Sequence, residues 1–176
     1  MARAYHHGAL AEAMVEEALA AVREHGADHV SLRAIAQALE VSPSAAYNHF
    51  ADKDALLVAV GQCGLAALDE RMARVLAAHP GASDDAARAR FAGLGRAYIA
   101  FAVEEPNLFR LVFGPICAEA DMGPESWTGP YAKLVAALDE MNARGRCARW
   151  SRCHGVGRDA WHRVAHHRGL SPARGG

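Results

Sequence analysis

The fold is decided by residues 31–57, which read SLRAIAQALEVSPSAAYNHFADKDALL. Two short amphipathic segments, 31–39 and 43–50, are joined by a turn of a few residues. The pair Ser42-Pro43 is a strong helix start, because a hydroxyl caps the first amides and proline suits the first helical position. Two short helices joined by a tight turn predict a helix-turn-helix, whose second helix enters the major groove of DNA.

The rest of the chain is also predicted to be helical. From about residue 7 to residue 141, apolar residues recur at steps of three and four, and the alternation typical of strands is absent. The first helix is expected to stop at Gly26. A long helix is expected to begin after Asp52 and to run to about residue 76. The turn-rich stretch 80–83 then separates two modules, with Ser83 capping the next helix.

Beyond this break the sequence predicts an all-α second module. One helix ends or restarts at Pro106, a short apolar helix covers 108–113, and a further amphipathic helix covers 131–141. The stretch 114–130, in which Gly and Pro repeat, is expected to be loop.

Charge divides the chain into three unlike parts. The formal net charge of the 176 residues is −1. Residues 1–60 carry four basic and eight acidic side chains (−4), residues 61–140 carry seven and eleven (−4), and residues 141–176 carry eight and one (+7). We predict a DNA-binding domain at 1–68, a helical ligand-binding and dimerisation domain at 69–144, and an Arg/His/Gly-rich basic tail at 145–176.

Several classes of protein are excluded by what the sequence lacks. No apolar run approaches the roughly 20 residues of a membrane helix, and no signal-peptide pattern follows the first residues. The four cysteines have no framework spacing, which is typical of reduced thiols. No nucleophile elbow, phosphate-binding glycine loop or paired-His metal motif is present. We expect a cytoplasmic, non-enzymatic protein without a cofactor.

The chemistry of the two short helices favours contact with DNA. Backbone amides at a helix N-terminus hold phosphate, small residues let a helix approach the groove floor, and polar side chains read base edges. A lysine that follows the second helix is placed to meet the DNA backbone. The predicted DNA-contacting residues are Ser31, Arg33, Ser42, Ser44, Ala45, Tyr47, Asn48, His49 and Lys53.

This stretch resembles the DNA-binding module of the tetracycline-repressor (TetR) family of bacterial regulators. The resemblance rests on Ile-Ala-x-x-Leu-x-Val-Ser at 35–42 and on Tyr-x-His-Phe-x-x-Lys-x-x-Leu-Leu at 47–57. The segments 3–8 and 105–113, and the element Trp-x-x-x-His-Gly at 150–155, are similar to one subgroup of that family.

The resemblance implies a homodimeric repressor on a near-palindromic operator, released when a small-molecule effector enters the larger domain. It also implies that Tyr47 and Lys53 contact phosphates.

Two features depart from the family pattern. The turn has Glu40 where glycine is usual, and a non-glycine residue held in a left-handed conformation costs on the order of 1 kcal/mol. The segment 43–50 contains no Arg or Lys, although a DNA-binding module is expected to be basic. Weak nonspecific affinity for DNA follows, unless histidines near their ordinary pKa of about 6.5 add positive charge.

Aromatic residues at helical spacing suggest where an effector binds. They form core first, and they also suit the wall of an apolar pocket. The predicted pocket residues are Phe91, Leu94, Tyr98, Phe101, Phe109, Trp127 and Tyr131.

The tail leaves alternatives open. It is either translated out of the original frame, as its few acids and apolar residues suggest, or a basic arm that adds nonspecific DNA affinity. Thiolate and imidazole are also metal ligands, which makes a metal-responsive protein one alternative function, although the spacing fits no compact site. The other alternative is a small-molecule-binding helical protein without productive DNA binding. The tail ligands in question are Cys147, Cys153, His154, His162, His166 and His167.

Overall fold

The computed structural model describes residues 7–120 and 124–145. Within these ranges the chain forms eight α-helices and one 3-10 turn, with no strand, so the predicted all-α class is confirmed. The elements are α1 (His7–His25), η1 (Ala27–His29), α2 (Leu32–Ala38), α3 (Pro43–Tyr47), α4 (Lys53–Ala78), α5 (Asp84–Glu104), α6 (Pro106–Val112), α7 (Pro115–Glu119) and α8 (Pro124–Ala143).

Three helix starts lie where the sequence placed them. The side chains of Ser42, Asp52 and Ser83 each accept a hydrogen bond from the backbone amide three residues later, at 3.2, 2.8 and 3.1 Å. Each cap satisfies one of the four amides that a helix leaves without an internal partner. Ser31 is the N-cap residue of α2 as well, but its side chain makes no capping hydrogen bond.

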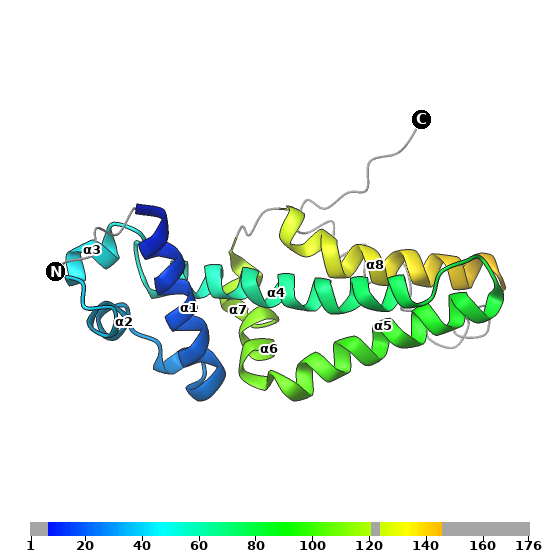
Figure 1. Ribbon diagram of the computed structural model, residues 1–176, viewed down its shortest axis with the longest axis horizontal. Coiled ribbons are helices and arrows are strands. Elements are labelled where there is room, and N and C mark those ends of the chain that lie inside the picture. The colour runs from blue at the N-terminus through cyan, green and yellow to red at the C-terminus, as the bar shows by residue number, and fades with distance from the viewer. Residues whose placement is uncertain (1–6, 121–123, 146–176) are drawn as a thin grey trace.

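Helix α4 runs along the molecule and connects its two ends. Its 26 residues span about 39 Å at 1.5 Å per residue. Figure 1 shows α1, α2 and α3 at one end of this helix, α5 and α8 along its other half, and α6 and α7 between the two groups. The predicted domain boundary at residues 68 and 69 falls inside α4, which continues through it without a break.

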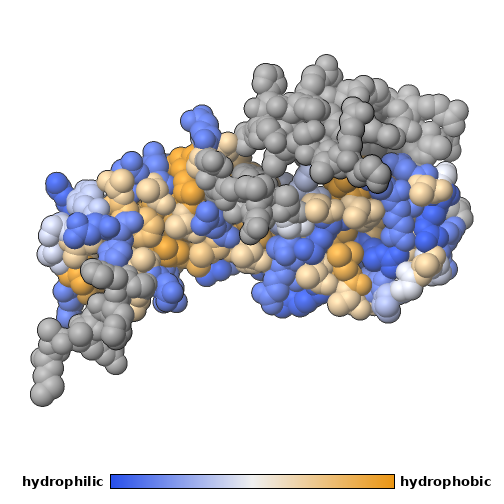
Figure 2. Space-filling model, turned by 90° about the horizontal axis from the view of Figure 1, so that it is seen from above, coloured by the Kyte–Doolittle hydropathy of each residue, from blue (hydrophilic) through white to orange (hydrophobic). Residues whose placement is uncertain are grey.

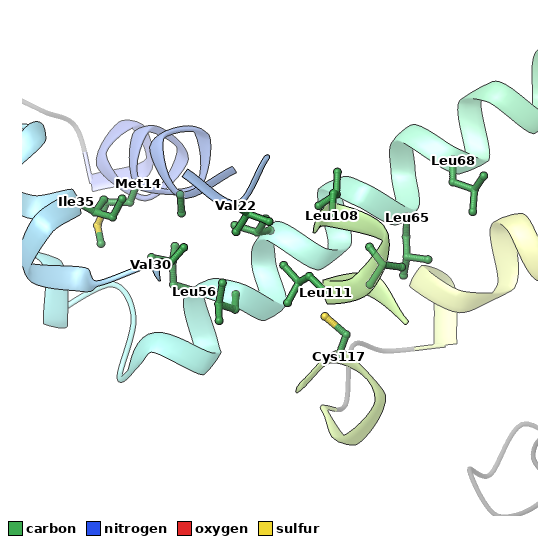
Figure 3. Close-up of a cluster of buried hydrophobic side chains, with 14 of the residues drawn as sticks. Met14, Val22, Val30, Ile35, Leu56, Leu65, Leu68, Leu108, Leu111 and Cys117 are labelled. Carbon is green, nitrogen blue, oxygen red and sulfur yellow. The ribbon is translucent and has the colours of Figure 1, made fainter. Parts of the chain in front are cut away.

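One apolar core connects the two ends. Figure 3 follows it from Met14 and Ile35, in the α1–α3 group, along α4 to Leu68. Leu108 of α6 and Cys117 of α7 belong to the same cluster. No polar or charged residue of the described chain is fully buried. The buried side chains of α6 and α7 are therefore continuous with those of the α1–α3 group.

The crossing of α6 over α4 depends on Gly64. A Cβ atom at this position would lie 2.6 Å from Cγ2 of Val112 and 3.1 Å from Cδ1 of Leu108. A side chain on Gly64 would require Val112 and Leu108 to shift. The sequence showed no local signal for this contact, because its partners lie more than forty positions away.

Two expected boundaries are wrong. The helix expected over 43–50 ends at Tyr47, after which Asn48 is the C-cap residue. The stretch 114–130 is not loop, because it contains α7 and the first turns of α8. Each of these helices begins at a proline, Pro115 and Pro124, a residue that suits the first helical position. The repeated prolines were therefore helix starts.

Ion pairs hold the end of the bundle remote from α1–α3. Arg90 of α5 bonds Glu140 of α8 through Nη2 and Oε1 at 2.6 Å, and its Nη1 also donates to the carbonyl oxygens of His79 and Gly81. Arg144 joins the network by donating to Asp84 at 2.7 Å and to Glu140 at 3.2 Å. Hydrophilic residues predominate over this end of the face shown in Figure 2.

Among the described helices, none has the length and apolar character needed to cross a bilayer. The described residues include two free cysteines, Cys63 and Cys117, and no group of side chains arranged to hold a metal ion. Cys147, Cys153 and the tail histidines lie outside the described residues.

Candidate nucleic-acid interface

Buried side chains fix which faces of α2 and α3 meet solvent. Leu32, Ile35 and Ala36 of α2 and Ala46 of α3 are at most 4% exposed and join the core cluster. Phe50, just beyond α3, packs against the same cluster. The opposite faces of the two short helices are therefore presented outward at one end of the molecule (Figure 1).

The turn between α2 and α3 contains one strained residue. Glu40 has a φ of 55°, in the left-handed region, and is the one non-glycine residue of the described chain with positive φ. Its amide donates to the Gln37 carbonyl at 3.1 Å, and the amide of Val41 donates to the Ala36 carbonyl at 2.9 Å. The expectation that a side chain replaces the usual glycine in a left-handed turn is confirmed.

Besides Ser31, five of the predicted DNA-contacting residues lie on the exposed side of this module. The Ser42 and Ser44 hydroxyls are 3.0 Å apart, so the two residues form one hydrogen-bonding group at the start of α3. Tyr47, at the last turn of α3, is 46% exposed although it is large and aromatic. An exposed tyrosine hydroxyl at this position is able to contact a phosphate oxygen of DNA. The other exposed members are Arg33 and Asn48.

The remaining predicted residues have other surroundings. Ser31 is exposed but caps nothing through its side chain. Ala45 and His49 are half-buried, and Ala45 packs against the core cluster. The Nζ of Lys53 donates to the backbone carbonyl of Asp28 at 2.9 Å, which ties the start of α4 to η1. Lys53 therefore has a structural partner that the sequence did not reveal.

The surroundings of α2 and α3 are acidic. Exposed carboxylates stand on α1 and at the start of α4, among them Glu12, Glu16 and Asp54. The rings of His25 and His29 are 6.2 Å apart at the end of α1, where positive charge suits the helix dipole. Long-range attraction to DNA is consequently weak, and affinity has to come from placed contacts.

A junction missed by sequence reasoning joins this module to α6. The Arg23 Nε bonds the Glu105 carboxylate at 3.1 Å, and the Asn107 side chain donates to the Arg23 carbonyl at 3.1 Å. Glu104 pairs with Arg71 of α4. The simplest interpretation of Glu104 and Glu105 from the sequence, as exposed charges at a helix end, holds for Glu104, whereas Glu105 is half-buried. No sequence signal links positions that lie 82 residues apart.

Three of the predicted effector residues pack together as an aromatic group. Tyr98 and Phe101 of α5 pack edge-on against Phe109 of α6, with ring centroids 5.4 and 6.3 Å apart. Leu94 is fully buried, whereas Phe91 and Tyr131 are 38% and 37% exposed. Trp127 belongs to α8 at a position whose side chain lies outside the described residues.

Two surface grooves of about 510 and 420 Å³ are present in the described part of the chain, and neither is lined by a predicted effector residue.

Comparisons with known proteins agree with this geometry at the N-terminal module. Residues 15–60 match the sequence model described as "Bacterial regulatory proteins, tetR family". These residues, from α1 to the first turns of α4, are thus a TetR-family DNA-binding domain, and the domain marks the chain as a transcriptional regulator. No curated protein matches the chain.

A solved structure has a similar fold over most of its length. It is described as that of a protein with unknown function from Rhodococcus sp. RHA1, with a TM-score of 0.59 and 26% sequence identity. The match covers 97% of this chain and 91% of that one.

Proposed function

We propose that this chain is a ligand-released repressor that binds a near-palindromic operator as a homodimer. The observation that carries the proposal is the outward face of a TetR-type helix-turn-helix, with Tyr47 exposed beside the Ser42–Ser44 hydroxyl pair. Tyrosine and serine hydroxyls bind phosphate oxygens and fix the register of the protein on the duplex. Asn48 and His49, at the end of α3, offer hydrogen bonds to base edges.

The effector is proposed to act through α6. This helix lies on α4 at Gly64, and its first turn is bonded to the end of α1 by Asn107 and the preceding Glu105. A small molecule that moves the aromatic side chains between α5 and α6 would move those bonds as well. The spacing of two DNA-binding modules would then change, which is a shift between binding and non-binding dimers.

The dimer is proposed to form through α8. Tyr131 and Leu138 lie seven residues apart, two helical turns, and each is 37% exposed. Val135 lies between them on the same stripe and is half-buried. Pairing of this apolar stripe with a second copy would place two α3 helices toward successive major grooves, about 34–36 Å apart.

A gel-shift with the DNA upstream of the chain's own gene tests the contacts. The double variant Tyr47→Ala, Lys53→Ala is expected to lose operator binding while its circular dichroism shows that it remains folded and helical. The single variant Lys53→Ala shows how much stability is lost with the hydrogen bond from Lys53 to the Asp28 carbonyl.

Ile99→Ala with Arg88→Ala removes one exposed apolar and one basic side chain from α5, far from α3, and is the matched control. It is expected to bind as the wild type does. Unchanged affinity in the Tyr47, Lys53 variant would refute the phosphate contacts.

A further inference from the structure

The two surface grooves differ in how their charges are balanced. The larger groove, between α4, α5 and α8, has Arg90, Lys133 and Glu140 on its walls. Arg90 is neutralised by Glu140 at 2.6 Å, and Lys133 is neutralised by Asp69 at 2.6 Å. This groove therefore offers no spare charge to a ligand.

The smaller groove, between α4 and α5, keeps its positive charge. It is lined by Arg74, Arg96 and His79, and no acidic residue lines it. Arg96 has no hydrogen-bond or ion-pair partner among the described residues. Arg74 has only Glu70, at 3.7 Å, one turn earlier on the same exposed helix face. An exposed pair of that kind contributes little and is easily exchanged for another anion.

The floor of this groove is apolar and made of small residues. Gly93 allows α5 to approach α4 so closely that a Cβ atom there would lie 2.5 Å from Cγ1 of Val75. A Cβ atom on Gly93 would also lie 3.8 Å from Nη2 of Arg96, so the guanidinium group of Arg96 folds back toward the floor. Ala97 and Ala100 extend the floor along α5.

Together these features specify the chemistry of an occupant. The groove is a shallow, open depression of about 420 Å³, and its apolar floor favours a hydrocarbon body. Guanidinium groups bind carboxylate and phosphate through paired N–H donors. We propose that the α4–α5 groove binds an amphipathic anion, with its hydrocarbon part on the Gly93–Ala97 floor and its anionic head between Arg74 and Arg96. The proposal goes beyond the repressor function and does not depend on it, because the groove lies remote from α2 and α3 (Figure 1).

The test is calorimetric titration of the full chain with octanoate, octyl phosphate and octan-1-ol, each below its aggregation concentration. Both anions are expected to bind with one site per chain and at least tenfold more tightly than the alcohol. The tighter of the two anions identifies the preferred head group. Failure of both anions to bind, or equal binding of octan-1-ol, would overturn the proposal.

Variants locate the site. Arg74→Gln with Arg96→Gln is expected to weaken binding of both anions at least tenfold. Arg88→Gln with Arg110→Gln removes the same charge from exposed positions outside the groove and is expected to change binding less than twofold. Ala97→Trp, which fills the floor, is expected to block octanoate in protein whose thermal unfolding shows that it is folded. Equal affinity in the Arg74, Arg96 variant and its control would place the anion elsewhere and contradict the proposal.

Discussion

At the scale of single residues, Glu40 shows how the helix-turn-helix differs from its family pattern. The turn needs a left-handed backbone, and Glu40 adopts it with a φ of 55°. Glycine reaches this region without a steric penalty, whereas a residue with a Cβ atom pays on the order of 1 kcal/mol. The sequence predicted this strain correctly because the turn is local and its geometry follows from the two flanking helices.

Glu40→Gly is therefore expected to raise the free energy of unfolding by about 1 kcal/mol, and the midpoint of thermal unfolding by about 2–4 °C. Glu40→Gln keeps the Cβ atom and removes only the charge, so its stability should stay near wild type. A gain in Glu40→Gln equal to that of Glu40→Gly would show that charge, and not backbone strain, is relieved. Differential scanning calorimetry at one pH makes the comparison.

At the scale of elements, Glu140 links the end of α8 to α5. The pKa of Glu140 lies below its ordinary value of 4.5, mainly because Arg90 donates hydrogen bonds to its carboxylate. The positive charges of Arg90 and Arg144 lower the pKa further, and some desolvation opposes the shift. A carboxyl whose folded pKa is depressed stabilises the fold above its unfolded pKa. That contribution is lost as the pH falls through the folded value.

Glu140→Gln is accordingly expected to reduce stability at neutral pH and to flatten the dependence of stability on pH below about 4.5. The neighbouring exposed Asp139 provides the control variant Asp139→Asn, which should follow the wild-type curve. Urea unfolding between pH 7 and pH 3 measures both. Parallel curves for the wild type and Glu140→Gln would contradict the role given to this ion pair.

Helix starts were predictable from the sequence, while helix packing was not. Ser42, Asp52 and Ser83 cap the helices that they were expected to cap, because a cap acts within three residues. The same local logic, applied to Pro115 and Pro124, would have found α7 and the true start of α8. The bonds from Arg23 to Glu105 and from Lys53 to Asp28 depend on tertiary contact. Such contacts produce no periodic pattern in the sequence from which they could be predicted.

The candidate site was predictable to a similar degree. Tyr47, Ser42 and Ser44 are exposed as expected, since the buried positions of α2 and α3 follow helical periodicity. Ala45 is half-buried because it packs against the core cluster, and the end of α3 was predicted three residues too late. The cationic groove between α4 and α5 escaped sequence reasoning because its arginines come from two helices.

At the scale of the whole molecule, the proposed dimer depends on the apolar stripe of α8 that contains Tyr131, Val135 and Leu138. Leu138→Glu puts a charge on that stripe and is expected to yield monomer at concentrations where the wild type sediments as a dimer. The affinity of Leu138→Glu for the operator should fall as the dimer is lost. Ala143→Glu adds the same charge to an exposed position off the stripe and should remain dimeric. Equal sedimentation of the two variants would exclude α8 as the dimer surface.

The near-neutral total charge conceals a DNA-binding module of formal charge −4, so a few placed contacts have to carry recognition. Each phosphate neutralised by a cation contributes about −0.9 to the log–log slope of affinity against salt. Arg33 and Lys53 from two protomers give a slope of about −4.

The most direct test of the proposed DNA recognition is the affinity of the full chain for the DNA upstream of its own gene, measured from low to physiological salt. A scrambled duplex of equal composition is measured beside it. We predict tight, sequence-selective binding with a slope near −4. Equal affinity for the scrambled duplex at every salt concentration would contradict the proposed sequence-selective recognition of DNA.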